Sequence, residues 1–549
     1  MALPTATVGE VRTTGSDTNG GGFCASQPSA GTDYSQQDAP VLSLTDVVTN
    51  GTTTVTSATG GFTVAMIGNL INIAGTTFMI EGWASTNSIT VERVTGTGTG
   101  QTAKVGGAWA TPGYACGQIV GGNKVWVKSG TYVPTVVTPN VAGGTMSLPA
   151  GTLAQPTRFE GYGTVRGDKI KPFIDATLVG TNPLFNLAGD YTEVDSFQLA
   201  SLRMCVQINS NYSKAYRITG VGGTYCYYVG SALGASMVDC DGVSIGGQSA
   251  FRIDSPSNIY GCTAHDCTLA SGFAIGVAGA VLTRCKSYNN HAKGFQISVA
   301  ATLIHCTAKG NLDSGFVWLS TTQLHSQAIS CLSVSNGLYG FQSSLATAAL
   351  RLMNCATYGN ASGATYNLNA VEGMITLTAD PFDDPTLLTL NDLPGAGALL
   401  RGAAYGGNLS IGAMQQGQAA DSAGVTTLLA RLTMDRAAAL DGVATAAALT
   451  ALSDLFTAWL AAQPAIPVAT VTGAPSATVV TVTGLPASAA NDYQGMFFQL
   501  VTGAHAWTAA RPVAGSSYSA GTTTLTFAGL TVVPNVGDTA ILAGSRKAT

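Results

Sequence analysis

The sequence predicts a mainly β protein built around a right-handed parallel β-helix, with small β-modules at both ends and one helical segment before the C-terminal module. Three observations predict this fold. Side chains of three kinds recur at a nearly constant spacing, apolar and polar residues alternate between the recurrences, and the composition is poor in charge and rich in small residues.

The recurring side chains lie in the middle of the chain. Cysteines recur at intervals of 22, 23, 21, 25 and 24: Cys240, Cys262, Cys285, Cys306, Cys331 and Cys355. Phenylalanines recur at intervals of 22, 22, 21 and 25, and glycine precedes the last four: Phe251, Phe273, Phe295, Phe316 and Phe341. Asn290, Asn311 and Asn336 each stand four residues before such a glycine, and Asn360 roughly continues the series. Internal periods of this length indicate a solenoid.

We call each series of recurring residues a ladder. Between the ladders, apolar and polar residues alternate, as in Ala280–Tyr288, and such alternation is typical of half-buried strands. Helical repeats need ~33 residues per unit. We therefore expect coils of short parallel strands, stacked at ~4.8 Å. Cysteine then stacks on cysteine and phenylalanine on phenylalanine in one core, with asparagine at a turn. Because stacked strands hold Cβ atoms farther apart than disulfides do, we expect these thiols to be reduced.

Composition and charge exclude several classes of partner. Charged residues are 10% of the chain, against ~25% in ordinary soluble domains. The net charge is −5 without any basic run, so we expect no nucleic acid partner. No secretory signal is visible at the start, and the apolar Ala444–Ala462 contains Ser453 and Asp454, so it is interpreted as a helix face and no membrane insertion is expected.

Two segments resemble the ends of a known fold. Val125–Tyr132 resembles the first coil of the pectate-lyase-like β-helix superfamily, and Phe382–Gln415 resembles its closing coil. The resemblance brackets about 117–416, which implies roughly 13 coils and a rod of about 60 Å. This superfamily includes lyases, hydrolases and inert phage spikes, so it does not by itself imply an activity.

A second resemblance concerns the N-terminus. Asn19–Phe23 and Gly31–Pro40 resemble the head of a family of bacteriophage β-helix proteins, in which a small β-module leads into the solenoid. The predicted organisation is an N-terminal arm for virion attachment (1–46), a small β-module (47–116), the β-helix (117–416), a helical oligomerisation segment (417–464) and a C-terminal β-module (465–549).

The helical segment has two interpretations. Within Val425–Gln463, apolar residues keep helical spacing in two phases, including Leu429, Leu432, Phe456 and Trp459. The helix either packs on its own β-helix or associates with its copies in a trimer.

Candidate chemistry is sparse. Between residues 201 and 360 there are five aspartates and no glutamate. Asp239 and Asp241 flank Cys240 and are expected to point outward together, a spacing that suits glycoside hydrolysis. The equivalent positions one coil later are Gly261 and Thr263, so the calcium-binding acidic stack of pectate-type lyases is not expected, and a solvated acidic edge is favoured.

A metal site is not expected either. Cys262, His265 and Cys267 lack a second ligand pair, and the ladder already explains Cys262. The five histidines stand at different positions relative to the cysteine ladder, so no catalytic triad with a serine nucleophile is expected. Cys24 and Cys116 lie outside the ladder and are the better candidates for a disulfide, perhaps between chains. No catalytic, cofactor-binding or metal-binding residue is therefore predicted, and no cofactor.

Together these features favour a structural or adhesive bacteriophage virion component that is not an enzyme. We expect a homotrimeric spike or fibre on tail, neck or head, attached to other virion proteins through its N-terminal arm and contacting the host surface, possibly its polysaccharide. The expected location is the virion surface, after synthesis in the host cytoplasm. The alternative is a tailspike depolymerase, a lyase or glycoside hydrolase that degrades host polysaccharide.

Overall fold

The computed structural model describes residues 3–412 apart from 135–144, 179–182, 320–325, 345–349, 369, 385–387, 402 and 404–410, and beyond these 468–471, 479–483, 497–500, 511–512, 515–519, 522–526 and 539–543. The chain forms two compact units, 1–426 and 427–549. The predicted helical segment 417–464 lies outside the described residues. None of the helices that are described is long and apolar enough to cross a membrane.

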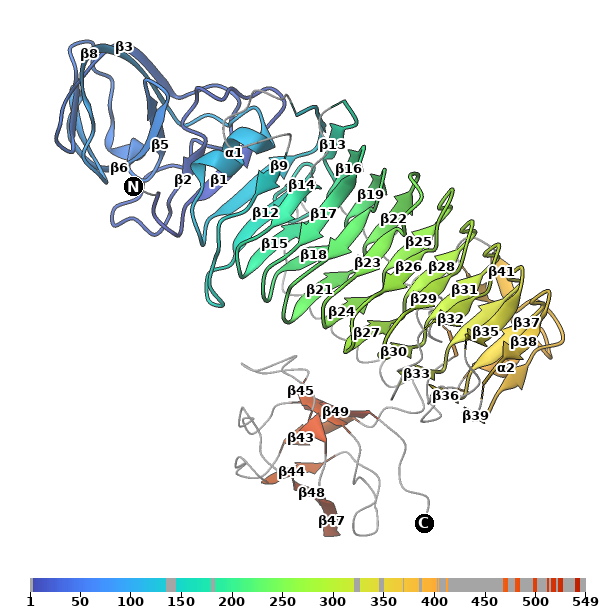
Figure 1. Cartoon of the computed structure of the whole chain (residues 1–549). Helices are drawn as coiled ribbons and strands as arrows, with labels where there is room; N and C mark the ends of the chain where they lie inside the picture. Colours follow the sequence, from blue (N-terminus) through green and yellow to red (C-terminus); the bar gives the residue numbers. More distant parts are fainter. Residues whose placement is uncertain are drawn as a thin grey trace. The chain divides into compact units, whose positions relative to one another are not determined.

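The first unit contains a rod of three sheets, in which strands of successive coils pair in parallel (Figure 1). Sheet 1 has 13 strands, in the order β2 (Gly22–Phe23), β1 (Val8–Val11), β9 (Lys124–Lys128), β12 (Thr157–Tyr162), β15 (Thr192–Asp195), β18 (Lys214–Tyr216), β21 (Ala235–Val238), β24 (Ser257–Tyr260), β27 (Ala280–Thr283), β30 (Ala301–Ile304), β33 (Ser326–Ile329), β36 (Leu350–Met353) and β39 (Ala370–Glu372).

The other two sheets follow in the same coils. Sheet 2 has 11 strands: β10 (Thr131–Tyr132), β13 (Phe173–Ala176), β16 (Gln198–Ser201), β19 (Thr219–Gly222), β22 (Asp241–Ser244), β25 (Thr263–His265), β28 (Lys286–Tyr288), β31 (Thr307–Lys309), β34 (Leu332–Val334), β37 (Ala356–Tyr358) and β40 (Ile375–Thr376). Sheet 3 has 10: β11 (Met146–Ser147), β14 (Pro183–Leu187), β17 (Met204–Ile208), β20 (Tyr227–Val229), β23 (Phe251–Ile253), β26 (Phe273–Ile275), β29 (Phe295–Ile297), β32 (Phe316–Trp318), β35 (Tyr339–Ser343) and β38 (Gly363–Tyr366). The predicted parallel β-helix is confirmed.

From β15 onward, one residue of positive φ marks the corner at which the chain turns from sheet 1 into sheet 2. It adopts positive φ, between 48° and 68°, in nine successive coils: Ser196, Arg217, Asp239, Gly261, Arg284, His305, Ser330, Asn354 and Gly373. The next residue points inward, and in six coils it is a ladder cysteine. The cysteine ladder therefore arises because a small side chain fills the inside of this tight corner.

The three ladders lie where the sequence predicts them. Phe251, Phe273, Phe295, Phe316 and Phe341 are fully buried and stack face to face along sheet 3 with ring centroids 4.6–4.9 Å apart. The Asn290 side-chain amide donates to Asn311 at 2.8 Å, Asn311 to Asn336 at 2.9 Å, and Asn336 to Asn360 at 2.8 Å. All 11 cysteines are free and buried, including Cys24 and Cys116. The expectation of a disulfide at those two positions is therefore not met, because both thiols are enclosed by the core.

A closed six-stranded barrel precedes the rod, so the predicted small β-module is confirmed. Its strands are β3 (Leu42–Asn50), β4 (Thr54–Ser57), β7 (Ser88–Val91), β6 (Thr76–Ser85), β5 (Leu70–Ile73) and β8 (Thr97–Val105), and a 3-10 turn at Val64–Met66 joins β4 to β5. Helix α1 (Pro112–Gln118) follows, and the Thr111 hydroxyl accepts from the Tyr114 amide at its N-terminus.

The first residues are part of the rod. Strand β1 pairs in parallel with β9, and β2 pairs antiparallel with β1. The buried Trp109 ring lies against Gly21, where a Cβ atom would stand 1.9 Å from Trp109 Cε2. The fully buried Glu10 carboxylate binds Arg166 at 2.7 Å and Arg12 at 2.9 Å. The glycine-rich motif Asn19–Phe23 therefore forms the joint between barrel and rod.

The coils end earlier than the resemblance implied. The last strands of sheets 1 and 2 end at Glu372 and Thr376. The hairpin β41 (Phe382–Asp384) and β42 (Thr389–Leu390), the short helix α2 (Gly397–Leu400) and Ile411 pack in one apolar cluster with Leu332 and Val334 of sheet 2. The segment that resembles a closing coil therefore covers the outside of the last coils.

The second unit confirms the predicted β-module at the C-terminal end. Its sheet contains β46 (Arg511–Pro512), β45 (Phe497–Leu500), β49 (Thr539–Ala543), β43 (Val468–Val471), β44 (Val479–Thr483), β48 (Thr522–Thr526) and β47 (Gly515–Ser519) in spatial order. The described pairings are antiparallel.

Candidate functional site on the outer face of sheet 1

An open cavity of about 290 Å³ lies on the outer face of sheet 1, over the neighbouring strands β12, β15 and β18. Strand alternation places every second residue outward, so charged residues of successive coils meet there. Four cations line the cavity: Arg158, Lys169, Lys214 and Arg217. Three carboxylates (Glu160, Glu193 and Asp195) and the Tyr216 ring complete its polar lining.

The carboxylates and cations form one network. Glu160 binds Lys124 at 2.6 Å and also binds Lys169. Asp195 binds Lys169 at 3.1 Å and also binds Arg217. Counting Lys124, five cations stand against three carboxylates, a local charge of +2 in a chain of net charge −5. The cavity is therefore suited to an anionic ligand.

The remaining acid, Glu193, pairs within the same cavity. It binds Arg158 at 2.7 Å and Lys214 at 3.6 Å. One set of equivalent positions on the strands β12, β15 and β18 holds Arg158, Glu193 and Lys214. Two residues farther along these strands, the equivalent positions hold Glu160, Asp195 and Tyr216. The cavity floor is thus two columns of side chains, ~6.5 Å apart along the strands.

The two lysines that share Glu160 have opposite pKa shifts. Burial lowers the pKa of Lys124, and the neighbouring Arg158 and Lys169 add to this, although Glu160 raises it. Burial also acts on Lys169, but its ion pairs with Glu160 and Asp195 prevail, and its pKa is raised. Lys169 therefore remains a cation, while Lys124 is the lysine of this pair more easily converted to a free amine base.

Calcium, which the resemblance to pectate-type lyases implies, does not fit this cavity. Each of the three carboxylates already binds two cationic side chains. A calcium site needs six to eight oxygen ligands free to face the ion. Across the described part of the chain, no group of three or more histidine, cysteine or acidic residues is arranged to hold a metal ion.

The aspartates singled out in the sequence do not act as an outward pair. Asp239 occupies the positive-φ corner between sheets 1 and 2, with its carboxylate beside Gly261 of the next coil. Asp241 begins β22 on the outer face of sheet 2. The expectation of a shared face was wrong because the chain turns the corner between the two residues.

His265, for which the sequence predicted no place in a catalytic triad, binds two carboxylates. Its Nε2 lies 3.0 Å from Asp241 and its Nδ1 lies 2.7 Å from Asp266. Its ring stacks on Tyr288 at 5.1 Å. The ion pair with Asp241 raises the pKa of His265 to about 9, against the effect of burial. His265 is therefore charged at neutral pH and is unsuited to act as a general base.

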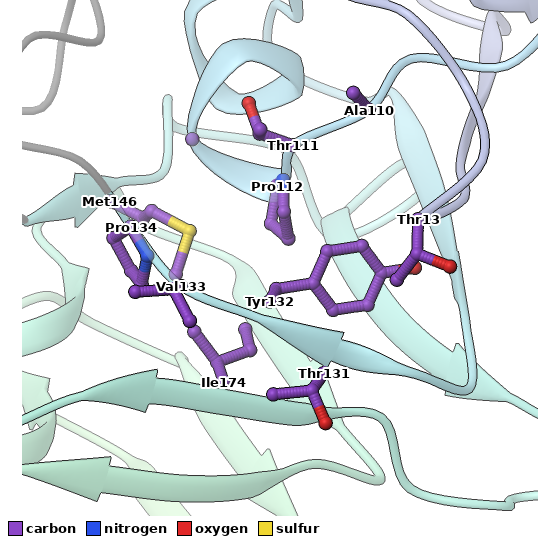
Figure 2. Close-up of a pocket in the computed structure, with 11 residues that line it drawn as sticks. Thr13, Ala110, Thr111, Pro112, Thr131, Tyr132, Val133, Pro134, Met146 and Ile174 are labelled. Carbon is purple, nitrogen blue, oxygen red and sulfur yellow. The ribbon is translucent and has the colours of Figure 1, made fainter.

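A second cavity, of about 210 Å³, lies below α1 (Figure 2). The side chains of Pro112, Tyr132, Met146 and Ile174 surround it, and none of its lining residues is charged. It lacks the groups needed for acid–base chemistry, so the charged cavity on sheet 1 is the better candidate.

The charged cavity could not be predicted from a repeat in the sequence, because the first coils are irregular. The equivalent positions Lys124, Arg158, Glu193 and Lys214 are separated by stretches of unequal length, so no fixed period marks them. A local signal did exist, because charged residues crowd one short stretch of a chain in which they are only 10% overall: Arg158, Glu160, Arg166, Asp168, Lys169 and Lys171.

The rod defines a parallel β-helix of the pectate-lyase-like kind. No protein-family model matches the chain, and neither does any curated protein. Among solved structures, the fold is similar to a pectate lyase named Pel9A (14% identity, 56% of this chain and 91% of that chain, TM-score 0.45). It is also similar to a rhamnogalacturonan lyase (15%, 46% and 70%, TM-score 0.33) and to an alginate lyase from Paenibacillus sp. (12%, 47% and 96%, TM-score 0.34).

The comparison corrects one prediction. The chain was expected not to be an enzyme, yet the solved structures named above are polysaccharide lyases. At these identities the likeness shows the fold alone. The expectation of a non-enzymatic protein is accordingly dropped, and the charged cavity becomes the basis for a functional proposal.

Proposed function

We propose that this chain binds and cleaves an acidic polysaccharide at the charged cavity on sheet 1. The observation that carries the proposal is a cavity open to solvent and lined by four cations against three carboxylates, beside Lys124, whose pKa is lowered. A uronate chain carries one carboxylate per sugar, which Lys169, Arg217 or Arg158 can neutralise. The sequence offered a tailspike depolymerase that degrades host polysaccharide as the alternative function, and the acidic polymer is a narrower form of it.

Elimination is the reaction that suits these groups. The Lys124 amine, once deprotonated, removes the proton from the sugar carbon next to the carboxylate. The electron pair forms a double bond to the adjacent carbon, and the bond from that carbon to the glycosidic oxygen breaks. The leaving oxygen takes a proton from solvent. Lys169 and Arg217 stabilise the negative charge that develops on the substrate carboxylate.

The test is to incubate the full chain with polyuronates and with neutral glycans and to measure unsaturated ends by ultraviolet absorbance. We expect product from a polyuronate alone. Lys124→Met should reduce kcat by ~100-fold or more, because it removes the general base. Arg351→Gln is the matched control, since Arg351 lies on the same sheet outside the cavity, paired with Glu372 at 3.1 Å.

Two results would contradict the proposal. One is that none of the polyuronates yields unsaturated ends. The other is that Lys124→Met cleaves as fast as Arg351→Gln, which would remove the cavity from the reaction.

The bacteriophage setting and the assembly remain part of the proposal. The head-like motifs Asn19–Phe23 and Gly31–Pro40 support a virion protein that acts on host-surface polysaccharide, located on the virion surface. A closed homotrimer follows from the low surface charge and the helical seam predicted at 425–463. Light scattering should give three times the 55.5 kDa of one chain, and a mass of 55.5 kDa at micromolar concentration would refute the trimer.

A further inference from the structure

Two tyrosines stand beside the charged cavity, at the turn that leads from sheet 3 into sheet 1. Tyr191 and Tyr212 each lie two residues before a cavity-lining residue, Glu193 and Lys214 respectively. Their rings stack with centroids 5.1 Å apart and planes inclined by 14°. Tyr212 is 44% exposed and Tyr191 is half-buried. An exposed aromatic stack therefore adjoins the first column of charges.

The backbone at both tyrosines is unusual for such large side chains. Tyr191 has φ of 54° and Tyr212 has φ of 57°. Positive φ is uncommon for bulky residues and is normally left to glycine. The equivalent positions of the next coils hold Gly234, Pro256 and Gly279, and that of the preceding coil holds Pro156, so two of the three coils that line the cavity carry these aromatic side chains.

The Tyr212 ring packs on the backbone of the next coil. A Cβ atom on Gly234 would lie 2.9 Å from Tyr212 Cδ1, so this glycine makes space for the ring. Each backbone amide keeps its bond to the next coil, Tyr191 to Asn211 and Tyr212 to Leu233. Within the described part of the chain, neither phenol hydroxyl has a hydrogen-bond partner. The pair is thus held by its backbone, while the hydroxyls and the exposed part of the Tyr212 ring remain available.

We infer that Tyr191 and Tyr212 form a sugar-binding subsite at one end of the charged cavity; this rests on the proposed function. The C–H face of a pyranose packs on aromatic rings, while the charged columns take its carboxylates. Three columns of side chains succeed one another along the strand direction. The tyrosines form the first, Glu193 and Lys214 belong to the second, and Asp195 and Tyr216 belong to the third. The polysaccharide therefore lies across the width of sheet 1 and not along the rod.

The experiment measures binding of oligogalacturonates and oligomannuronates of increasing length by calorimetry. The variant is Tyr191→Asn/Tyr212→Asn, because asparagine tolerates positive φ and the fold should be retained. The matched control is Tyr339→Asn/Tyr366→Asn, which changes another stacked tyrosine pair (centroids 4.8 Å apart) on sheet 3. Lys214→Met tests the charged column separately.

We expect the variant at Tyr191 and Tyr212 to bind long oligosaccharides about tenfold more weakly and dimers as the wild type does. The control pair should change neither, and Lys214→Met should weaken binding at every length. If the wild type binds and the tyrosine variant matches it at all lengths, the subsite is refuted while the proposed function stands. If the wild type binds no acidic oligosaccharide, the proposed function and the subsite both fail.

Discussion

Phe295 stacks on Phe316 with ring centroids 4.8 Å apart and planes inclined by only 3°. The centroid distance equals the strand spacing, so the rings have no freedom to tilt without moving the coils themselves. Sheet 3 therefore holds a continuous aromatic column whose geometry is set by backbone hydrogen bonds.

Removing one ring from that column should be costly. Phe295→Ala leaves a cavity between two rings that cannot close it, so we expect the free energy of unfolding to fall by ~3–5 kcal/mol. Urea unfolding followed by fluorescence measures the change. Leu312→Ala, at a residue 60% exposed, is the control and should stay within ~0.5 kcal/mol of the wild type. Equal effects of the two substitutions would contradict the column.

The joint between barrel and rod should tolerate no side chain at Gly21. Gly21→Ala adds both a positive-φ cost and a clash with Trp109, so we expect a loss of ~2 kcal/mol or more. Gly75→Ala separates the two effects, because Gly75 has φ of 88° with nothing within 4 Å of its Cβ position. Gly75→Ala should cost ~1 kcal/mol by the same measurement. If Gly21→Ala is no less stable than Gly75→Ala, the contact between Trp109 and Gly21 does not require the absence of a side chain at position 21.

His265 should make stability depend on pH. Its folded pKa, about 9, lies above its ordinary value of 6.5, because Asp241 binds the charged ring. The stabilisation is therefore complete below pH 6.5 and is lost as pH rises through about 9. We expect a loss of roughly 1–2 kcal/mol over this window after allowance for solvent screening. Urea unfolding at both pH limits measures it.

Asp241→Asn is the companion variant for this titration. It removes the main partner of His265, so the loss between the two pH limits should shrink. NMR titration of His265 should show its pKa moving down toward 6.5. A His265 pKa that is unchanged by the substitution would mean that Asp241 does not hold the ring.

The thiols should be unreactive in the folded protein. All 11 cysteines are buried, and burial raises the pKa of Cys116 to about 12 and that of Cys267 to about 11. Because the thiolate is the reactive form, a thiol reagent should label the native chain negligibly and the unfolded chain at every cysteine. A non-reducing gel should show no linked chains. Rapid labelling of native Cys24 or Cys116, or a linked dimer, would contradict their burial.

The regular coils could be predicted from the sequence, and the site could not. From Cys240 to Cys355 one corner geometry repeats, so identical inward positions select identical residues. Before Lys214 the coils differ in length, and the sequence carries no period there. Lys124 of β9 and Glu160 of β12 are far apart in the sequence. They come into contact because β12 pairs with β9 in the sheet. Such contacts depend on turn geometry that no residue pattern records.

The antiparallel strand β2 at the N-terminal edge of sheet 1 has a consequence for self-association. An open parallel edge would invite the end of another rod to add to it, and the result would be a growing fibril. Here β2 pairs with β1 in the opposite direction, and the Phe23 backbone bridges on to Asn69 of the barrel module. Another rod therefore cannot continue sheet 1 in parallel at this edge.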